Sequence, residues 1–208
     1  TKLDAEELII NNFETLPEIN NLNNKYNVFQ KDPSSVEMIL LTDAFAPEGK
    51  LCLQLNFNRQ EGGWCGFYTI LTGVVLDKYS QLNFLVRGAT GEEKFLIELS
   101  YPEEMKKSPI EINPADFMDT NISKWTKVTI PFGKLRLGKN ELAGVQSLVI
   151  KFEEKNSSTI FLDNLYLSTD GKPAKVKINT RVVNNFDTKK NIQSLLPVPE
   201  DFSEIKLR

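Results

Sequence analysis

Short apolar runs alternate with polar residues along most of this chain, and Gly, Pro, Asn and Asp residues separate the runs. The clearest run covers residues 51–58 (LCLQLNFN), in which leucine or phenylalanine occupies every second position. Alternation with a period of two is typical of a β-strand that buries one face. Because antiparallel sheets expose one face to solvent in this way, we expect antiparallel strands.

The pattern predicts about nine strands and little helix. The predicted strands cover residues 9–14, 36–41, 51–58, 64–71, 82–87, 95–101, 125–132, 148–153 and 160–167. Residues 102–122 contain three prolines and are predicted to form a long connection with one helical turn at 115–118. Many short strands separated by turn residues are typical of an all-β antiparallel β-sandwich, here of the jelly-roll type.

Composition narrows the range of partners. The hydrophobic content of 40% and charged content of 25% are typical of a soluble globular protein. A net charge of −3 argues against nucleic acid or an anionic membrane as the main partner. No apolar run approaches the roughly 20 residues of a transmembrane helix, so we expect no membrane insertion. The absence of histidine excludes histidine-dependent catalytic triads and histidine–zinc sites.

The two cysteines are predicted to be free thiols. Cys52 is in phase with Gln54 on one predicted strand, whereas Cys65 is in phase with Phe67 on the next. Their side chains are therefore not expected to face each other, which argues against a disulfide. Nothing in the sequence indicates the base or electropositive environment that a reactive thiol needs.

An internal repeat affects the expected domain organisation. Residues 9–22 (IINNFETLPEINNL) and 182–195 (VVNNFDTKKNIQSL) share six of fourteen positions. We therefore predict a jelly-roll module over 1–170, a linker over 171–180, and the start of a second repeat module or an extended tail over 181–208. Chance similarity in an Asn-rich chain is the alternative. Since the chain begins at Thr1 rather than Met, we interpret it as a mature product or a piece of a longer protein.

An acidic residue interrupts the last predicted strand, in residues 159–168 (TIFLDNLYLS). A buried carboxylate such as Asp163 needs a cation or several hydrogen-bond donors, because burial without a partner costs several kcal/mol. Glu14 closes the first predicted strand. If the first and last strands meet, Glu14 and Asp163 are expected to share one calcium ion. The alternative is a carboxylate capped by backbone N–H groups.

Several motifs in order give the chain a family resemblance. The most specific are YSQLNFLVRG (79–88), WTKVTIPF (125–132) and IFLDNLYL (160–167). Over residues 9–168 the chain resembles the galactose-binding-like jelly rolls, including carbohydrate-binding module family 11 and the complex I intermediate-associated protein 30 domain. The resemblance implies a module without catalysis of its own, often joined to glycoside hydrolases or repeated in tandem. It also implies a structural calcium held by Glu14 and Asp163.

Sugar-binding sites combine aromatic rings that stack on pyranose faces with planar polar side chains that bond the hydroxyls. Trp64 and Tyr68 share one strand face and are the expected platform. The polar candidates at strand positions that should face away from the core are Asn56, Asn83, Arg87, Glu98 and Lys151. Of these, we select Asn83, Arg87 and Glu98 as ligand-binding. Arg87 and Glu98 flank the turn at 88–91 and are expected to pair across it. The alternative is a solvated sheet face with a weak surface ion pair.

The favoured function is a non-catalytic carbohydrate-binding module of a multidomain extracellular or cell-surface protein, secreted by a bacterium. Its partners are a polysaccharide or oligosaccharide such as a β-glucan, bound on one sheet face, and neighbouring domains of the same polypeptide. The alternative is a structural or assembly module that binds protein. A third hypothesis is a glycosidase that uses paired carboxylates such as Glu98 and Glu153. Any chain with 28 acidic residues offers such pairs, so the pattern is not specific.

Overall fold

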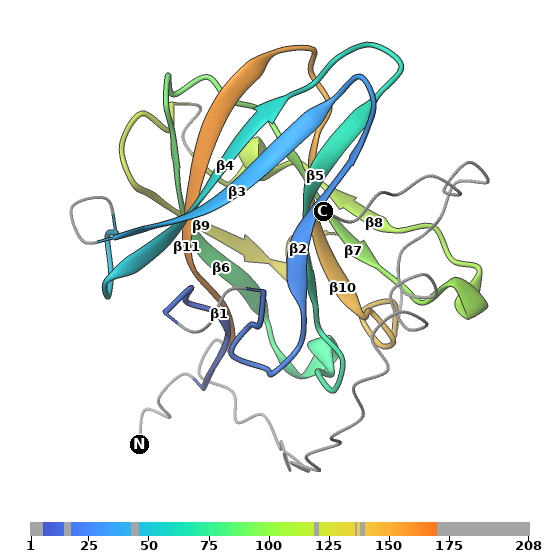
Figure 1. Cartoon of the computed structure of the whole chain (residues 1–208). Helices are drawn as coiled ribbons and strands as arrows, with labels where there is room; N and C mark the ends of the chain where they lie inside the picture. The colour runs from blue at the N-terminus through green and yellow to red at the C-terminus, as the bar shows by residue number, and fades with distance from the viewer. Residues whose placement is uncertain are drawn as a thin grey trace.

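The computed structural model describes residues 6–14, 18–42, 46–118, 121–135, 137 and 140–169, in which eleven strands form two antiparallel sheets (Figure 1). One sheet has the strand order β3 (Ser35–Thr42), β4 (Leu51–Asn58), β11 (Ser157–Ser168), β6 (Gln81–Gly88) and β9 (Thr126–Pro131), with β1 (Glu7–Asn11) also paired to β11. The other has the order β2 (Tyr26–Lys31), β5 (Trp64–Ile70), β10 (Ser147–Phe152), β7 (Leu96–Ser100) and β8 (Ile110–Ile112). We call them the six-stranded and the five-stranded sheet.

Helical structure in the described residues is limited to single turns of 3-10 helix. These are η1 (Leu76–Lys78), η2 (Glu103–Met105), η3 (Pro114–Phe117) and η4 (Phe132–Lys134). None of the helices in this part of the chain has the length and apolar character needed to cross a membrane. The helical turn predicted at 115–118 corresponds to η3, and the prediction of an all-β antiparallel sandwich is confirmed.

The core lies between the sheets because side chains alternate along each strand. On β5, Cys65 and Phe67 join the main core, whereas Tyr68 belongs to a separate cluster on the outer side. Phe57 on β4 and Phe152 on β10 connect the two sheets through stacked rings, with centroids 3.8 Å apart and planes 6° apart. Both rings are buried, so this contact belongs to the centre of the sandwich.

The long strand β11 organises the six-stranded sheet. One of its edges pairs with β4 as far as Leu162 and with β1 from Leu165 onward. Between these partners lies the Asp163–Asn164 dipeptide, where the register with β6 also shifts. Asn164 has a positive φ of 46°, which asparagine tolerates better than most residues. The polar interruption in the sequence therefore marks the break where two neighbouring strands meet.

The sequence analysis predicted about nine strands and missed two. The missed strands are β2 and β8. The first predicted strand was also too long, since β1 ends at Asn11 and Phe13 has a positive φ of 58°. Tyr26 and Val28 on β2 are apolar and alternate, but they directly follow an Asn-rich loop. Strand β8 has only three residues, too few for periodicity to register.

The predicted pairing of Arg87 with Glu98 is wrong, because β6 and β7 belong to different sheets. The chain crosses between the sheets at the loop that contains Glu93, a buried residue. The carboxylate of Glu93 accepts hydrogen bonds from Thr90, Gly91 and the Ser158 hydroxyl at 2.6–2.9 Å. Burial alone would raise the pKa of Glu93, but these bonds outweigh it and the pKa is lowered. This network fixes the crossover.

Both cysteines are free, as predicted, and both are buried. Cys52 lies on β4 and Cys65 on β5, in different sheets. Burial raises the pKa of each thiol to about 11, which keeps both protonated near neutral pH. The predicted linker at 171–180 and the predicted second module or tail at 181–208 lie outside the described residues, so both stay predictions.

Candidate functional site

The outer side of the five-stranded sheet carries an aromatic pair at its β2 edge. Phe29 on β2 and Trp64 on β5 have ring centroids 5.7 Å apart and planes inclined by 47°. Both residues are half-buried. We call this outer side the five-stranded face. A tilted pair of half-exposed rings is suited to stacking against the apolar face of a ligand.

Gly66 makes room for this pair. It lies opposite Phe29 in the β2–β5 register. A Cβ atom on Gly66 would lie 2.6 Å from Cζ of Phe29 and 2.2 Å from the backbone oxygen of Ile150. Neither approach is tolerated, so only glycine allows the Phe29 ring to lie across β5 at this point. The glycine in the WCGFY sequence therefore shapes the face.

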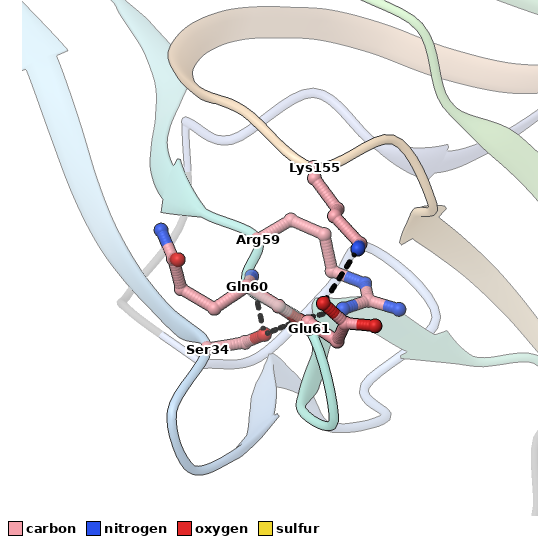
Figure 2. Close-up of polar contacts among 5 residues, drawn as sticks. All are labelled: Ser34, Arg59, Gln60, Glu61 and Lys155. Carbon is pink, nitrogen blue, oxygen red and sulfur yellow. Dashed lines mark hydrogen bonds and ion pairs between the residues drawn. The ribbon is translucent and has the colours of Figure 1, made fainter.

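Figure 2 shows polar contacts between loops that meet in the segment before β5, whose first residue is Trp64. The Ser34 hydroxyl accepts a hydrogen bond from the Gln60 backbone N–H at 2.9 Å and donates to the Gln60 carbonyl at 3.2 Å. The Lys155 ammonium lies 2.8 Å from the Glu61 carboxylate. Three connections, β2–β3, β4–β5 and β10–β11, are therefore joined by contacts to the segment just before β5.

Tyr68 shares the five-stranded face with Trp64, as the alternation predicted, but it is only 3% exposed. It packs with Ile70 and Val149 in a small apolar cluster that Phe29 also contacts. Burial raises the pKa of the Tyr68 phenol to about 12. The exposed partner of Trp64 is therefore Phe29 rather than Tyr68. Sequence analysis missed Phe29 because it missed β2.

Polar groups of the five-stranded face lie on its central and far strands. The Lys151 ammonium on β10 is 3.0 Å from the Glu98 carboxylate on β7 and 3.6 Å from that of Glu153. Glu111 on β8 lies directly opposite Glu98 in register. Burial alone would lower the pKa of Lys151, but its hydrogen bond to Glu98 and the nearby carboxylates raise it. Lys151 therefore stays charged and holds Glu98 in place.

The remaining predicted ligand residues, Asn83 and Arg87, lie on β6 in the six-stranded sheet. Asn83 is 1% exposed, donates to the Ser168 hydroxyl at 2.9 Å and accepts from the Thr129 hydroxyl at 2.9 Å. The five predicted residues are therefore divided between two sheets. Trp64, Tyr68 and Glu98 are brought to one face, and the single cluster that we predicted does not form.

The two predicted metal ligands both reach the loop before β4. The Glu14 carboxylate accepts hydrogen bonds from the backbone N–H groups of Lys50 at 2.5 Å and Leu51 at 2.7 Å. Asp163 is 1% exposed and accepts from the backbone N–H of Asn164 at 2.7 Å and of Glu48 at 3.4 Å. Each carboxylate therefore has backbone donors, which was the alternative to a shared cation.

The ionised form of Asp163 is nevertheless disfavoured. Its pKa is raised to about 7, chiefly by burial and in part by the carboxylates of Glu48 and Glu14. The hydrogen bonds from the two backbone N–H groups lower this pKa, but they do not offset the increase. Within the described residues, no group of three or more His, Cys, Asp or Glu side chains is placed to hold a metal ion. A cation here would accordingly draw part of its coordination from backbone oxygens and water.

Comparison with known proteins assigns the chain to a family. Residues 18–169 match the family of carbohydrate binding domain 30. The chain belongs to this family. No curated protein matches the chain at a significant level. Family 30 modules are carbohydrate-binding domains, so the prediction of a non-catalytic carbohydrate-binding module is confirmed for this part of the chain.

Solved structures of related modules share the fold. A family 30 carbohydrate-binding module is 21% identical, with a TM-score of 0.59 over 83% of this chain and 95% of its own. The family 11 module of a cellulosomal cellulase of Clostridium thermocellum is 14% identical, with a TM-score of 0.58 over 78% of this chain and 94% of its own. The family 30 module of another cellulosomal cellulase of that organism is 18% identical, with a TM-score of 0.54 over 79% and 99%. The similarity to the complex I intermediate-associated domain stays a prediction.

Proposed function

We propose that this family 30 module binds a linear β-glucan across the five-stranded face. The observation that carries the proposal is the juxtaposition of the Phe29–Trp64 ring pair with the Lys151–Glu98 pair on one side of one sheet. Rings offer rigid apolar area at small entropy cost, and a fixed ion pair offers donors and acceptors in a defined direction. The combination suits a sugar chain, which presents apolar faces and hydroxyl edges.

The arrangement favours a chain that crosses the strands rather than one that follows them. Phe29 and Trp64 lie on β2 and β5, whereas Lys151 and Glu98 lie on β10 and β7. Strands are about 4.8 Å apart, so these residues cover three spacings, or about 14 Å. Along β5 itself the next outward ring, Tyr68, is buried. An oligosaccharide of a few sugar units is long enough to reach from the rings to the ion pair.

The structural relatives support a β-glucan as the ligand class. A family 11 module from Clostridium thermocellum with the same fold has been solved in complex with a β-1,3-1,4-mixed-linked tetrasaccharide, at 14% identity and a TM-score of 0.57. A β-1,2-glucanase from Parabacteroides distasonis matches 70% of this chain over 23% of its own length. We further propose a secreted, multidomain parent protein, since such modules occur in cellulosomal cellulases.

Replacing Trp64 by alanine should weaken binding to soluble mixed-linkage β-glucan by roughly 10- to 100-fold, because a central aromatic contact of about 1.4–2.7 kcal/mol is lost. Phe29→Ala should have a smaller effect in the same direction. Lys151→Ala removes the polar anchor and should weaken binding several-fold. Isothermal titration and affinity electrophoresis against a panel of neutral polysaccharides measure each change.

Two variants serve as controls for this experiment. Trp64→Phe keeps a ring and should retain most of the affinity. Lys134→Ala removes an exposed lysine at η4, beyond the end of β9 in the other sheet, and should leave binding unchanged. If the wild type binds no glycan in the panel, the proposed function fails. If it binds and both Trp64→Ala and Phe29→Ala leave the affinity intact, the ligand lies elsewhere on the module.

We also propose a structural calcium ion beside Asp163. The support is a buried carboxyl group whose pKa is raised to about 7, chiefly by burial and in part by the nearby Glu48 and Glu14 carboxylates. Asp163 and Glu14 would supply carboxylate oxygens, and the ion would neutralise charge that burial disfavours. No contact to sugar is implied by this role.

Calcium should raise the thermal unfolding temperature of the module, since it binds the native state and has no equivalent site in the unfolded chain. At a free calcium concentration 100 times the Kd, the stabilisation is about 2.7 kcal/mol. Differential scanning calorimetry with excess EDTA and then with added calcium measures the shift. Magnesium at the same concentration is the control, because its smaller shell demands stricter geometry. Identical melting temperatures in EDTA and calcium would refute the site.

A further inference from the structure

The two tryptophans of the chain lie on opposite outer sides of the sandwich. Trp64 belongs to the five-stranded face. Trp125 directly precedes β9, and its ring lies 6.4 Å from that of Phe161 on β11, inclined by 63°. Phe161 points away from the core, since its neighbours Ile160 and Leu162 point into it, and the Trp125 ring lies against it on the same side. We call the outer side of the six-stranded sheet the six-stranded face.

The register places one row of side chains straight across the six-stranded face. Phe161 pairs with Arg87 on one side and with Gln54 on the other, and Gln54 pairs with Ile39. Because Thr126 pairs with Val86, Trp125 falls beside Arg87. The row therefore crosses all five strands of the main path from β3 to β9. With strands about 4.8 Å apart, it covers about 19 Å.

The Arg87 guanidinium lies over aromatic rings near the centre of this row. Its guanidinium carbon is 4.4 Å from the centroid of Phe161 and 5.9 Å from that of Trp125. Contact with aromatic faces restricts the guanidinium, which carries five N–H donors in a rigid fork. Arg87 and Trp125 are both half-buried, so each retains an exposed edge. The centre of the row thus combines an oriented donor with a ring.

Polar side chains in the next register row, on β4 and its neighbours, contact Gln54 of this row. The Gln54 amide donates to the Asn56 side-chain oxygen at 2.6 Å, and the Thr159 hydroxyl donates to the same oxygen at 2.8 Å. Asn56 in turn donates to the Glu37 carboxylate at 3.3 Å. Each of these side chains is held by its neighbours, and each is half-buried or exposed. They form a fixed set of amide, hydroxyl and carboxylate groups.

We propose that the six-stranded face is a second glycan-binding surface, on which a neutral oligosaccharide stacks on Trp125 and bonds Arg87, Gln54 and Asn56. The ring and the planar amides supply the two kinds of contact that sugars need. The positive charge of Arg87 and the negative charge of Glu37 beside the row balance each other, which favours a neutral glycan over an acidic one. The inference goes beyond the proposed function and concerns different residues.

Two binding faces would make the module bivalent. One module would then contact two segments of a polysaccharide, and the second contact would gain from effective concentration. Retention on a polymer would exceed that expected from the affinity for a short oligosaccharide. Trp125 and Trp64, which lie on opposite sides, report on the two contacts separately.

The experiment uses two variants of the full chain, Trp64→Phe and Trp125→Phe, each of which keeps a single tryptophan. Each is titrated with the β-1,3-1,4-mixed-linked tetrasaccharide and with a panel of neutral oligosaccharides, and the tryptophan fluorescence is followed. Isothermal titration of the wild type gives the stoichiometry. We expect both tryptophans to respond, with different affinities, and a stoichiometry of two. Thermal unfolding confirms that both variants are folded.

The outcomes separate this inference from the proposed function. A response of Trp64 alone, with a stoichiometry of one, overturns the second surface and leaves the proposed function intact. A response of Trp125 alone supports the second surface and removes the five-stranded face from the proposed function. No response and no binding heat across the panel overturn both.

Arg87→Lys is the conservative test of the contact itself. It keeps the positive charge but loses the planar guanidinium and its fork of donors. We expect the Trp125 response to need at least 5-fold more ligand, while the Trp64 response stays unchanged. Equal responses of the wild type and Arg87→Lys at Trp125 would remove Arg87 from the contact and overturn the proposed geometry.

Discussion

Without calcium, the wild-type module is expected to lose roughly 4 kcal/mol of unfolding free energy relative to Asp163→Asn between pH 4 and pH 8. The reason is the burial of Asp163, which raises the pKa of its carboxyl from 3.8 to about 7. Asparagine keeps the side-chain oxygen that accepts the Asn164 N–H but has no charge to bury.

The direction of this change in stability with pH follows from proton binding. Between its two pKa values, the folded state keeps the proton on Asp163 while the unfolded state releases it. The contribution of Asp163 to the unfolding free energy is therefore fully present below pH 4. It falls as the pH rises from 4 through 7 and does not change further above that. Glu93, whose pKa is lowered, acts in the opposite sense at lower pH. Subtracting the Asp163→Asn curve from the wild-type curve removes contributions of this kind.

Urea unfolding at half-unit pH steps, in EDTA, measures both curves. Parallel curves would show that Asp163 does not titrate on unfolding and would contradict the assignment of its environment. A second arm adds calcium at pH 8. If the proposed ion binds beside Asp163, the wild type should recover stability and Asp163→Asn should recover little, because the principal ligand charge is missing.

Replacing Phe152 by alanine is expected to lower the unfolding free energy by about 3–5 kcal/mol. Phe152 is 1% exposed and stacks on Phe57, so its removal leaves a cavity at the contact between the two sheets. Because Phe152 adjoins Lys151 on β10, the variant should also weaken glycan binding on the five-stranded face. Chemical denaturation with fluorescence detection measures the loss of stability.

Phe152→Leu is the matched control, since leucine fills part of the space and should cost clearly less. A double-mutant cycle with Phe57→Ala isolates the ring–ring contact, for which we expect a coupling of about 0.5–1.5 kcal/mol. Additive effects of the two alanine variants would show that the stacked arrangement contributes nothing beyond the area that each ring buries.

The fold class could be predicted because β-strands leave a local signature. Alternation on β4 (Leu51–Asn58) follows from side chains that point to opposite sides of a strand. The same local logic placed Trp64 and Tyr68 on one side of β5 and kept Cys52 apart from Cys65. Alternation did not identify β2, because a six-residue strand beside an Asn-rich loop gives a weak signal.

The site required information that no local pattern contains. Alternation states which residues share a side of one strand, but not which sheet that strand joins. Glu98 and Arg87 are close in sequence and face outward, yet the crossover at Glu93 sends their strands to different sheets. Conversely, Phe29 meets Trp64 only because β2 pairs with β5, and only because Gly66 leaves space for the ring.

The sequence by itself determined the all-β architecture, the two free thiols and the carbohydrate-binding class, through periodicity, composition and the order of motifs. Tertiary structure alone decided which rings and charges share a face, how exposed each is, and that Asp163 lies between β1 and β4. The physical reason is that strand pairing joins residues distant in sequence. The choice of partner depends on the packing of the whole core, which no single segment encodes.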